Sequence, residues 1–405
     1  MSNRALEGLS VLEYCTGISG PYCAKLMADL GADVVKIEAP ETGDEARRRP
    51  PFPGDEVDPE KSGLFFYLNT NKRSITLNPA TPEGKDLFVK LAGAVDVLVV
   101  DKPPGFMDAL GLGYDALKQI NPGLIMTSIT PFGLTGPYKD YKAYQLNTSH
   151  VSGQGYMLPI PAEDSTRAPV KMGGNSSDYD PGIVTAIAVM AAYFHKGITG
   201  KGQLIELSKQ EALICMQRVE SVTYPNDGVS MSRNQGEVGP NMPGGVMPCK
   251  DGFVVFVTPM EHQWKALMTL IGDPEWSKEA WCQDPSGRMQ HVEEINRHLL
   301  DWLGDHTQEE IFRRGQALGC PVAPLQSAEK VINSEQLKET GFFQDIEHPE
   351  LGKIKFPTAP YHFSKTPWKL ARLAPHLGEH NEEVFIDRLG LEKAELAVLK
   401  KAGAI

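Results

Sequence analysis

The stretch LSVLEYCTGISGPYCAKLMADLGADVVKIEAP, residues 9–40, decides the fold class. Its two ends are short apolar runs typical of buried strands, and its middle is amphipathic with the spacing of a helix that Gly31 ends. A glycine-containing turn, TGISGP, joins the first strand to the helix. The order of strand, helix and strand predicts a parallel strand pair with a helical crossover.

The same alternation continues further along the chain. Strands are predicted at 74–78, 95–101 and 124–130. A helix is predicted over 81–94, because Thr81 is a suitable N-cap and Pro82 suits the first helical position. We therefore expect an α/β fold whose large domain is an open, parallel, Rossmann-like sheet with helices on both faces.

The amino-acid composition changes after residue 225, where Gly, Asn and Pro become frequent. We expect a smaller α/β domain over 225–330, which contains the strand-like run GFVVFVTP. The C-terminal part returns to the earlier pattern. The large domain is therefore predicted to comprise 1–200 and 335–405, with linkers at 201–224 and 331–334.

The composition restricts the classes of function. The 405 residues include 40 Lys and Arg against 52 Asp and Glu, a net charge of −12, and such a field repels nucleic acids and anionic membrane surfaces. The N-terminus has no signal-peptide pattern, and the longest apolar run, 183–194, is too short to span a bilayer. We expect a cytoplasmic protein that binds neither nucleic acid nor membrane.

The cysteines and glycines argue against two kinds of cofactor. The six cysteines are scattered and lack metal-ligand spacing, which predicts reduced thiols and no metal site. Glu38 ends the second strand about where a ribose-binding acid would lie, but the turn before it has only Gly17 and Gly20. A dinucleotide motif needs three glycines, so a nicotinamide cofactor is disfavoured.

Two carboxylates lie close together in the segment SSDYDPGIV, residues 176–184. Pro181 suits the first position of a helix, which makes Asp180 the expected N-cap. Asp178 lies two residues before that cap, in a loop rich in Gly and Ser. It is therefore free to point into a cleft and is the better candidate for chemistry.

Seven motifs, spread in this order over nearly the whole chain, resemble the class III CoA-transferases, the family that includes formyl-CoA and carnitine CoA-transferases. They are LEGLSVLEYCTGISGPYCAKLMADLGADVVKIEAPETGDEAR, LNTNKRSITLN, PPGFMDALGLGYDAL, NPGLIMTSITPFGLTGPY, DYDPGIVTAIAVMAA, TGKGQLIELS and APHLGEHNEE. The family's nucleophile is an Asp followed four residues later by Gly. That spacing selects Asp178 and Gly182, the same carboxylate that the capping argument leaves free.

The resemblance implies a reaction through anhydrides. Asp178 would attack a donor acyl-CoA to form a mixed anhydride, and the CoA thiolate would then form an aspartyl-CoA thioester and release the donor acid. An acceptor carboxylate would reverse these steps to give the new acyl-CoA. An unperturbed carboxylate, with a pKa near 4, needs no general base for this role.

The resemblance also implies the residues that bind substrate. Gly244 and Gly245 are expected in a mobile glycine loop that excludes water and stabilises the oxyanion. Coenzyme A thioesters are expected as substrates, with no tightly bound cofactor. The positions expected to contact CoA are Gly17, Ile18, Arg47, Lys72, Arg73, Lys102 and Lys142.

Two positions depart from the family pattern. Ala109 stands where members often have Arg, and Ala39 stands where they often have a basic residue. The missing cations are expected from the arginines at 47–49. The resemblance further implies an interlocked homodimer, and a heteromer with a related subunit is the alternative assembly.

Two other functions remain open. Racemases of the same fold use a His in a segment resembling KAYQLN, where this chain has Tyr144. A tyrosine with a pKa near 10 is a poor base for that reaction, so the transferase is favoured. A non-catalytic subunit of a mixed oligomer is the second alternative, and the presence of Asp178 argues against it. The donor and acceptor acids are not identified by the sequence.

Overall fold

The computed structural model describes residues 4–159, 166–216, 220–230 and 243–405. The chain divides into two compact units, Met1–Arg233 with Gln344–Ile405, and Asn234–Phe343. These limits differ from those proposed from the sequence. The segment 201–224, expected to be a linker, contains a strand and a helix of the first unit, and 331–334 lies inside the second unit.

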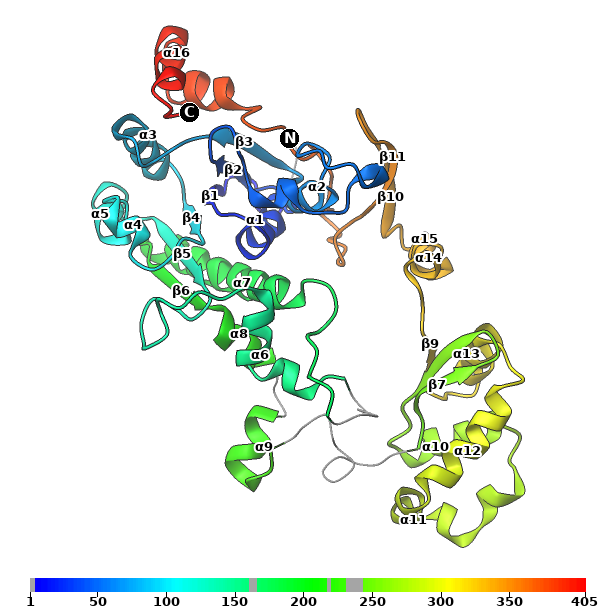
Figure 1. Ribbon diagram of the computed structural model, residues 1–405. Coiled ribbons are helices and arrows are strands. Elements are labelled where there is room, and N and C mark those ends of the chain that lie inside the picture. Colours follow the sequence, from blue (N-terminus) through cyan, green and yellow to red (C-terminus); the bar gives the residue numbers. More distant parts are fainter. Residues whose placement is uncertain (1–3, 160–165, 217–219, 231–242) are drawn as a thin grey trace. The chain divides into compact units, whose positions relative to one another are not determined.

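The first unit is built on a six-stranded, fully parallel sheet (Figure 1). Its strands are β1 (Ser10–Tyr14), β2 (Asp33–Glu38), β3 (Lys72–Thr76), β4 (Val97–Val100), β5 (Ile125–Thr130) and β6 (Leu204–Ser208). The order β3-β2-β1-β4-β5-β6 confirms the open parallel sheet expected from the sequence. The order changes direction between β1 and β4, and ligands of such sheets bind at the carboxyl ends of the strands near this point.

Helices cover both faces of this sheet (Figure 1). One face is covered by α1 (Ser19–Asp29) and α7 (Ser176–Thr199). The other is covered by α3 (Pro82–Gly93), α5 (Tyr114–Ile120) and α16 (Lys393–Lys401). The further helices of this unit are η1 (Glu45–Arg48), η2 (Pro53–Asp55), α2 (Gly63–Asn69), α4 (Phe106–Ala109), α6 (Gln145–Val151), η3 (Gln154–Met157), α8 (Lys209–Met216), α9 (Glu220–Asp227) and η6 (Glu383–Arg388).

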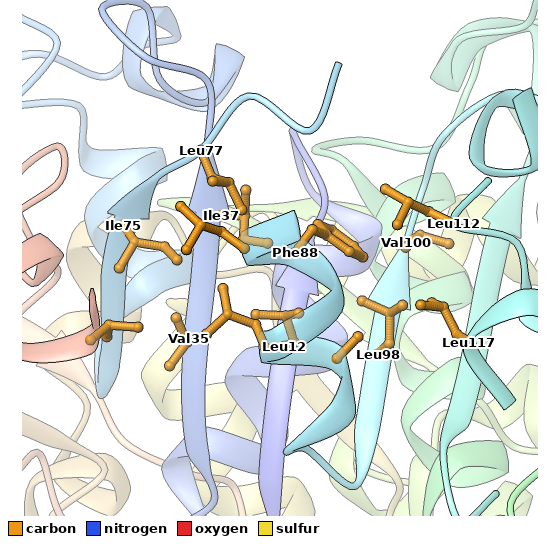
Figure 2. Packing of buried hydrophobic residues seen from close by; sticks show 14 of the residues in the cluster. Leu12, Val35, Ile37, Ile75, Leu77, Phe88, Leu98, Val100, Leu112 and Leu117 are labelled. Carbon is orange, nitrogen blue, oxygen red and sulfur yellow. The ribbon is translucent and has the colours of Figure 1, made fainter. Parts of the chain in front are cut away.

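Alternate residues of each strand enter the two layers of the core, as the period of two requires. Leu12 and Val35 face α3, and Figure 2 shows them packed with Phe88 of that helix. Val11 and Val34, one residue earlier in each strand, face α1 and α7. The two faces are therefore both apolar, which explains the nearly continuous hydrophobic runs of these strands.

The local signals that define α3 and the chain end are confirmed by hydrogen bonds. Thr81 caps α3, because its Oγ1 accepts a 3.0 Å hydrogen bond from the N–H of Gly84. The C-terminal segment returns to the sheet, where the N–H of Asn78 donates to the carbonyl of Ala404 at 2.8 Å. A hairpin of β10 (Phe343–His348) and β11 (Gly352–Pro357) precedes that segment.

The second unit has its own sheet and core. Its three strands are β7 (Gly245–Cys249), β8 (Gly252–Phe256) and β9 (Val322–Pro324), paired antiparallel. Its helices are α10 (Glu261–Leu270), η4 (Glu275–Lys278), η5 (Ala280–Gln283), α11 (Pro285–Gln290), α12 (Val292–Leu303), α13 (Gln308–Ala317), α14 (Ala328–Ile332) and α15 (Glu335–Glu339). Trp264, Leu299 and Ile311 pack against Phe256 in a separate apolar cluster.

The helix α7 is long and apolar enough, by length and composition, to cross a membrane, and it is the one such helix among the described residues. A single such helix is in itself a weak indication of a membrane span. One side of α7, with Ala186, Val189 and Ala192, is buried in the layer that covers the sheet.

Candidate active site

Asp178 lies in the first turn of α7, because the helix begins earlier than its sequence suggests. The N–H groups of Asp178 and Tyr179 donate to the carbonyl of Asn175 at 2.9 and 3.0 Å, so the helix starts at Ser176. Pro181 is inside the helix, where it has no N–H to donate to the carbonyl four residues earlier. The expectation that Asp180 is the N-cap is therefore wrong.

The backbone at Asp178 is held against the first turn of α1. Ser19 Oγ donates a 2.8 Å hydrogen bond to the carbonyl of Asp178. One helical turn further on, a Cβ added to Gly182 would lie 2.8 Å from the carbonyl oxygen of Ser19. Glycine at this position lets the two helices approach closely, which gives a physical reason for the spacing of Asp178 and Gly182.

The side chain of Asp178 forms an ion pair that the sequence prediction missed. Lys209 Nζ lies 2.9 Å from Asp178 Oδ1, and the two side chains are 20% and 13% exposed. Lys209 is the first residue of α8 and directly follows β6. Its place just past a strand that ends at the ligand-binding edge was the signal that could have identified it.

Tyr179, the residue after Asp178, belongs to a cluster of aromatic side chains. The ring of Tyr179 contacts that of Tyr22 at a centroid distance of 4.7 Å, and Tyr67 lies 6.4 Å from both. Burial, with a smaller contribution from Tyr22, raises the pKa of Tyr179 to about 12, so its hydroxyl stays protonated at neutral pH. Burial also raises the pKa of Asp180. The nucleophile candidate therefore has one cation beside it, and the two residues that follow it in α7 are poorly hydrated.

The turn between β1 and α1 is fixed by carboxylates. The N–H of Thr16 donates to Asp101 at 2.7 Å, and the N–H of Gly17 donates to Asp44 at 2.8 Å. Gly17 has a φ of 73°, which favours glycine, and Ile18 is buried behind it. Both residues shape the turn, and a direct contact with CoA stays a prediction for them.

A cavity of about 450 Å³ opens at the carboxyl ends of β1, β2 and β4. Lys102 is the one cation among the described residues that line it, and it also lines a neighbouring cavity of about 210 Å³. Its ammonium lies 4.2 Å from the ring centroid of Tyr14 and 3.3 Å from Asp101. Burial opposes its charge, but Asp101 leaves the pKa of Lys102 raised, so the cation is retained.

Lys72, which was expected to contact CoA, is instead part of a buried charge cluster formed by Glu13, Lys36, Asp44 and Lys72. Its ammonium donates to Glu13, to the carbonyl of Pro21 and to Asn69 at 2.7 to 2.9 Å. All three N–H groups are thus used inside the protein. This corrects the prediction, because a fully paired and buried ammonium has no donor left for a phosphate.

The two arginines expected to contact CoA are also paired within the chain. Arg47 is buried and binds Glu38, Glu60 and the carbonyl of Pro375. Arg73 is the second residue of β3 and binds Asp33 and Glu383 at the amino ends of the strands, away from the ligand-binding edge. Neither arginine is placed to bind CoA in this structure, so both predictions are corrected.

Other cations remain accessible. Lys142 is exposed in the segment before α6, and no partner is recorded for it in the described parts of the chain. Arg48 is exposed, with one N–H donated to the carbonyl of Thr42, and Arg49 is half-buried. Ala39 lines the larger cavity, so the departure from the family pattern lies at the cavity wall. Ala109 ends α4, which is next to the smaller cavity.

Gly244 and Gly245 belong to the second unit, at the start of β7. Their φ angles of 101° and 87° lie in the region that favours glycine. The N–H of Gly244 donates to Asn296 at 2.9 Å. Their action beside Asp178 stays a prediction. Within the described ranges, no group of three or more His, Cys, Asp or Glu side chains could hold a metal ion.

Comparisons with known proteins identify the relatives of this chain. The model of CoA-transferase family III matches residues 6–381. Two proteins named formyl-CoA:oxalate CoA-transferase, from Streptomyces avermitilis and Streptomyces coelicolor, are each 33% identical to it, over 99% and 100% of this chain and all of each relative. A crystal structure of a CAIB/BAIF family protein from Brucella suis has a TM-score of 0.83 and 29% identity, and the match covers 95% of this chain and 99% of that one.

Proposed function

Because the chain belongs to CoA-transferase family III, we propose that it moves CoA from an acyl-CoA donor to a free carboxylic acid, with Asp178 as the nucleophile. The observation that carries the proposal is the position of that carboxylate. It lies in the first turn of α7, mostly shielded from water, with one oxygen bound by Lys209.

The proposed chemistry needs no general base. An oxygen of Asp178 attacks the thioester carbonyl of the donor, the C–S bond breaks, and CoA leaves as a thiolate with the electron pair. The thiolate then attacks the Asp178 carbonyl and releases the donor carboxylate. The acceptor carboxylate repeats these two steps in reverse order. The side chain of Asp178 is only 13% exposed, and this shielding would limit hydrolysis of the anhydrides by water.

We place the nucleotide end of CoA in the cavity at the carboxyl ends of β1, β2 and β4. Lys102 supports this placement, since it is the cation among the described residues that line this cavity and lies two residues after β4. Arg48, Arg49 and Lys142 are the remaining candidates for the phosphates. CoA is here a substrate, and no tightly bound cofactor is required.

The relatives are named for formyl-CoA and oxalate, so this pair is the first to test. An acyl-CoA racemase has weaker support, because Tyr144 at the corresponding position is 80% exposed and its phenol is a poor base. A non-catalytic subunit is disfavoured because the ion pair of Asp178 is intact.

We also propose that the protein is a cytoplasmic homodimer. Its six cysteines are all free, which suits a reducing compartment. On the outer side of α7, Ile187 is 65% exposed, Phe194 74% and Ile198 73%. Such an exposed apolar patch suits contact with a second chain. Sedimentation of the purified protein tests this, and an active monomer would contradict it.

The transferase proposal is tested with the chain purified alone. Formyl-CoA and succinyl-CoA serve as donors, and a panel of oxalate, acetate, succinate and benzoate serves as acceptors. We expect CoA transfer to at least one acid. We also expect a CoA adduct on the tryptic peptide 172–196, which hydroxylamine converts to a hydroxamate at Asp178. An adduct at Asp180 or Glu206, or the absence of any adduct, would overturn the assignment.

A further inference from the structure

The Asp178–Lys209 pair is a charge pair that the proposed reaction must break, and this conclusion rests on the proposed function. In the resting protein Lys209 Nζ lies 2.9 Å from Asp178 Oδ1. Once Asp178 carries an acyl group or CoA, its carbonyl has no negative charge. The ammonium of Lys209, four-fifths shielded from solvent, then loses its ionic partner at the reacting carbon.

Lys209 has donors to spare even in the resting state. An ammonium has three N–H groups, and Asp178 is its one recorded acceptor in the described parts of the chain. Lys72 differs, because its three N–H groups all have acceptors inside the protein. Lys209 can therefore bind a second oxygen without any change of fold.

We propose that Lys209 binds the acceptor carboxylate when Asp178 is converted to the CoA thioester. The anionic acid takes the place of the lost charge on Asp178 and is held next to the thioester carbonyl. Its oxygen forms a bond to that carbon, the C–S bond breaks, and CoA leaves as a thiolate with the electron pair. The thiolate then attacks the acceptor carbonyl, the acceptor C–O bond to Asp178 breaks, and the restored carboxylate regains Lys209.

This arrangement selects an anion over water at the step where hydrolysis competes. The net charge of −12 repels an incoming carboxylate, so a local cation is needed at the reacting carbon. A neutral nucleophile gains much less from the same ammonium. Lys209 is thus a residue that determines specificity for carboxylates, and its contribution depends on the charge of the attacking group.

The test compares two nucleophiles on one intermediate. The wild-type thioester is formed with donor acyl-CoA, freed of small molecules by rapid desalting, and mixed either with the acid that wild type uses fastest or with uncharged hydroxylamine. Loss of the CoA adduct from peptide 172–196 is followed by mass spectrometry. In Lys209→Met we expect discharge by the acid to slow about 10- to 100-fold, as for loss of a hydrogen bond to a charged group, and discharge by hydroxylamine to change less than about twofold.

Two variants serve as controls. Lys209→Arg keeps the charge and should retain most of the discharge by the acid. Lys201→Met removes an exposed lysine just before the same strand, β6, and should behave as wild type. In wild type, nitrate should slow discharge by the acid and leave discharge by hydroxylamine unchanged, and this measurement holds even if Lys209→Met does not fold.

Equal slowing of both nucleophiles, or of neither, in Lys209→Met would overturn the role of Lys209 and leave the transferase proposal standing. The same holds if nitrate slows both equally or has no effect. Absence of any wild-type adduct would instead overturn the proposed function itself.

Discussion

The buried charge cluster and the Asp178–Lys209 pair contain contacts of nearly the same length but opposite character. Lys36 lies 2.7 Å from Glu13, and both side chains are 0% exposed. Lys209 lies 2.9 Å from Asp178, and these side chains are 20% and 13% exposed. The length of an ion pair therefore says little about its role. Solvent access and unused donors distinguish the pair that can react from the one that supports the fold.

The charges of the buried cluster depend on one another. Burial alone would raise the pKa of Glu13, but Lys36 and Lys72 hold it lowered. Burial lowers the pKa of Lys72 to about 8, against the opposing effect of Glu13. The cluster joins β1, β2 and β3 with the loop that binds the N–H of Gly17, so it fixes the turn at the ligand-binding edge.

The largest expected effect concerns the Asp178–Lys209 pair. Asp178→Asn removes the nucleophile and should lower the rate of CoA transfer by at least about 10⁴-fold. The amide can still accept a hydrogen bond from Lys209, so the free energy of unfolding should change by less than about 1 kcal/mol. Steady-state assays and urea denaturation measure the two quantities. Substantial residual transfer would show that another group forms the intermediate.

The next effect is on the buried cluster. Glu13→Gln leaves two buried ammonium groups without their shared carboxylate and should cost about 3–5 kcal/mol of stability. Because the pKa of Glu13 is lowered in the folded state, its contribution is present above the unfolded value of 4.5 and is lost as the pH falls through the folded value. The variant should therefore show a weaker loss of stability on acidification than wild type.

Glu7→Gln is the matched control for that variant, since Glu7 is exposed just before β1. It should leave the free energy of unfolding within about 0.5 kcal/mol of wild type. If both variants unfold at the same urea concentration, the buried charge cluster makes no net contribution to stability. The cluster would then not be the pair that supports the fold, and the contrast with the Asp178–Lys209 pair would be wrong.

The fold was predictable from the sequence because it depends on local patterns. The alternation of apolar runs and amphipathic segments predicted the first five strands and the capped helix α3, all of which the structure contains. The family motif predicted Asp178 through its distance from Gly182, and close packing at Ser19 explains that distance.

The roles of the charged residues were not predictable in the same way. The motif NTNKRS gave no sign that Lys72 is buried, because its partner Glu13 is distant in sequence. Lys209 was missed because its partner, Asp178, is 31 residues away in the sequence, and because the motif TGKGQLIELS ends one residue before it. Burial and pairing of a charge depend on tertiary contacts, which spacing along one chain does not specify.

The smallest expected effect tests where α7 begins. If Asp180 were the N-cap, its replacement would cost about 1 kcal/mol. The structure instead starts the helix at Ser176 and leaves Asp180 half-buried, with a pKa that burial raises. A carboxyl group whose pKa is raised on folding opposes the folded state at pH values above that pKa. Asp180→Asn should therefore leave stability unchanged or slightly increased at pH 7, within about 0.5 kcal/mol, with transfer activity retained. A loss of about 1 kcal/mol in the free energy of unfolding, measured by urea denaturation, would show that Asp180 is the N-cap and that the helix begins at Pro181. Asp178 would then lie in a loop before the helix, as the sequence suggested.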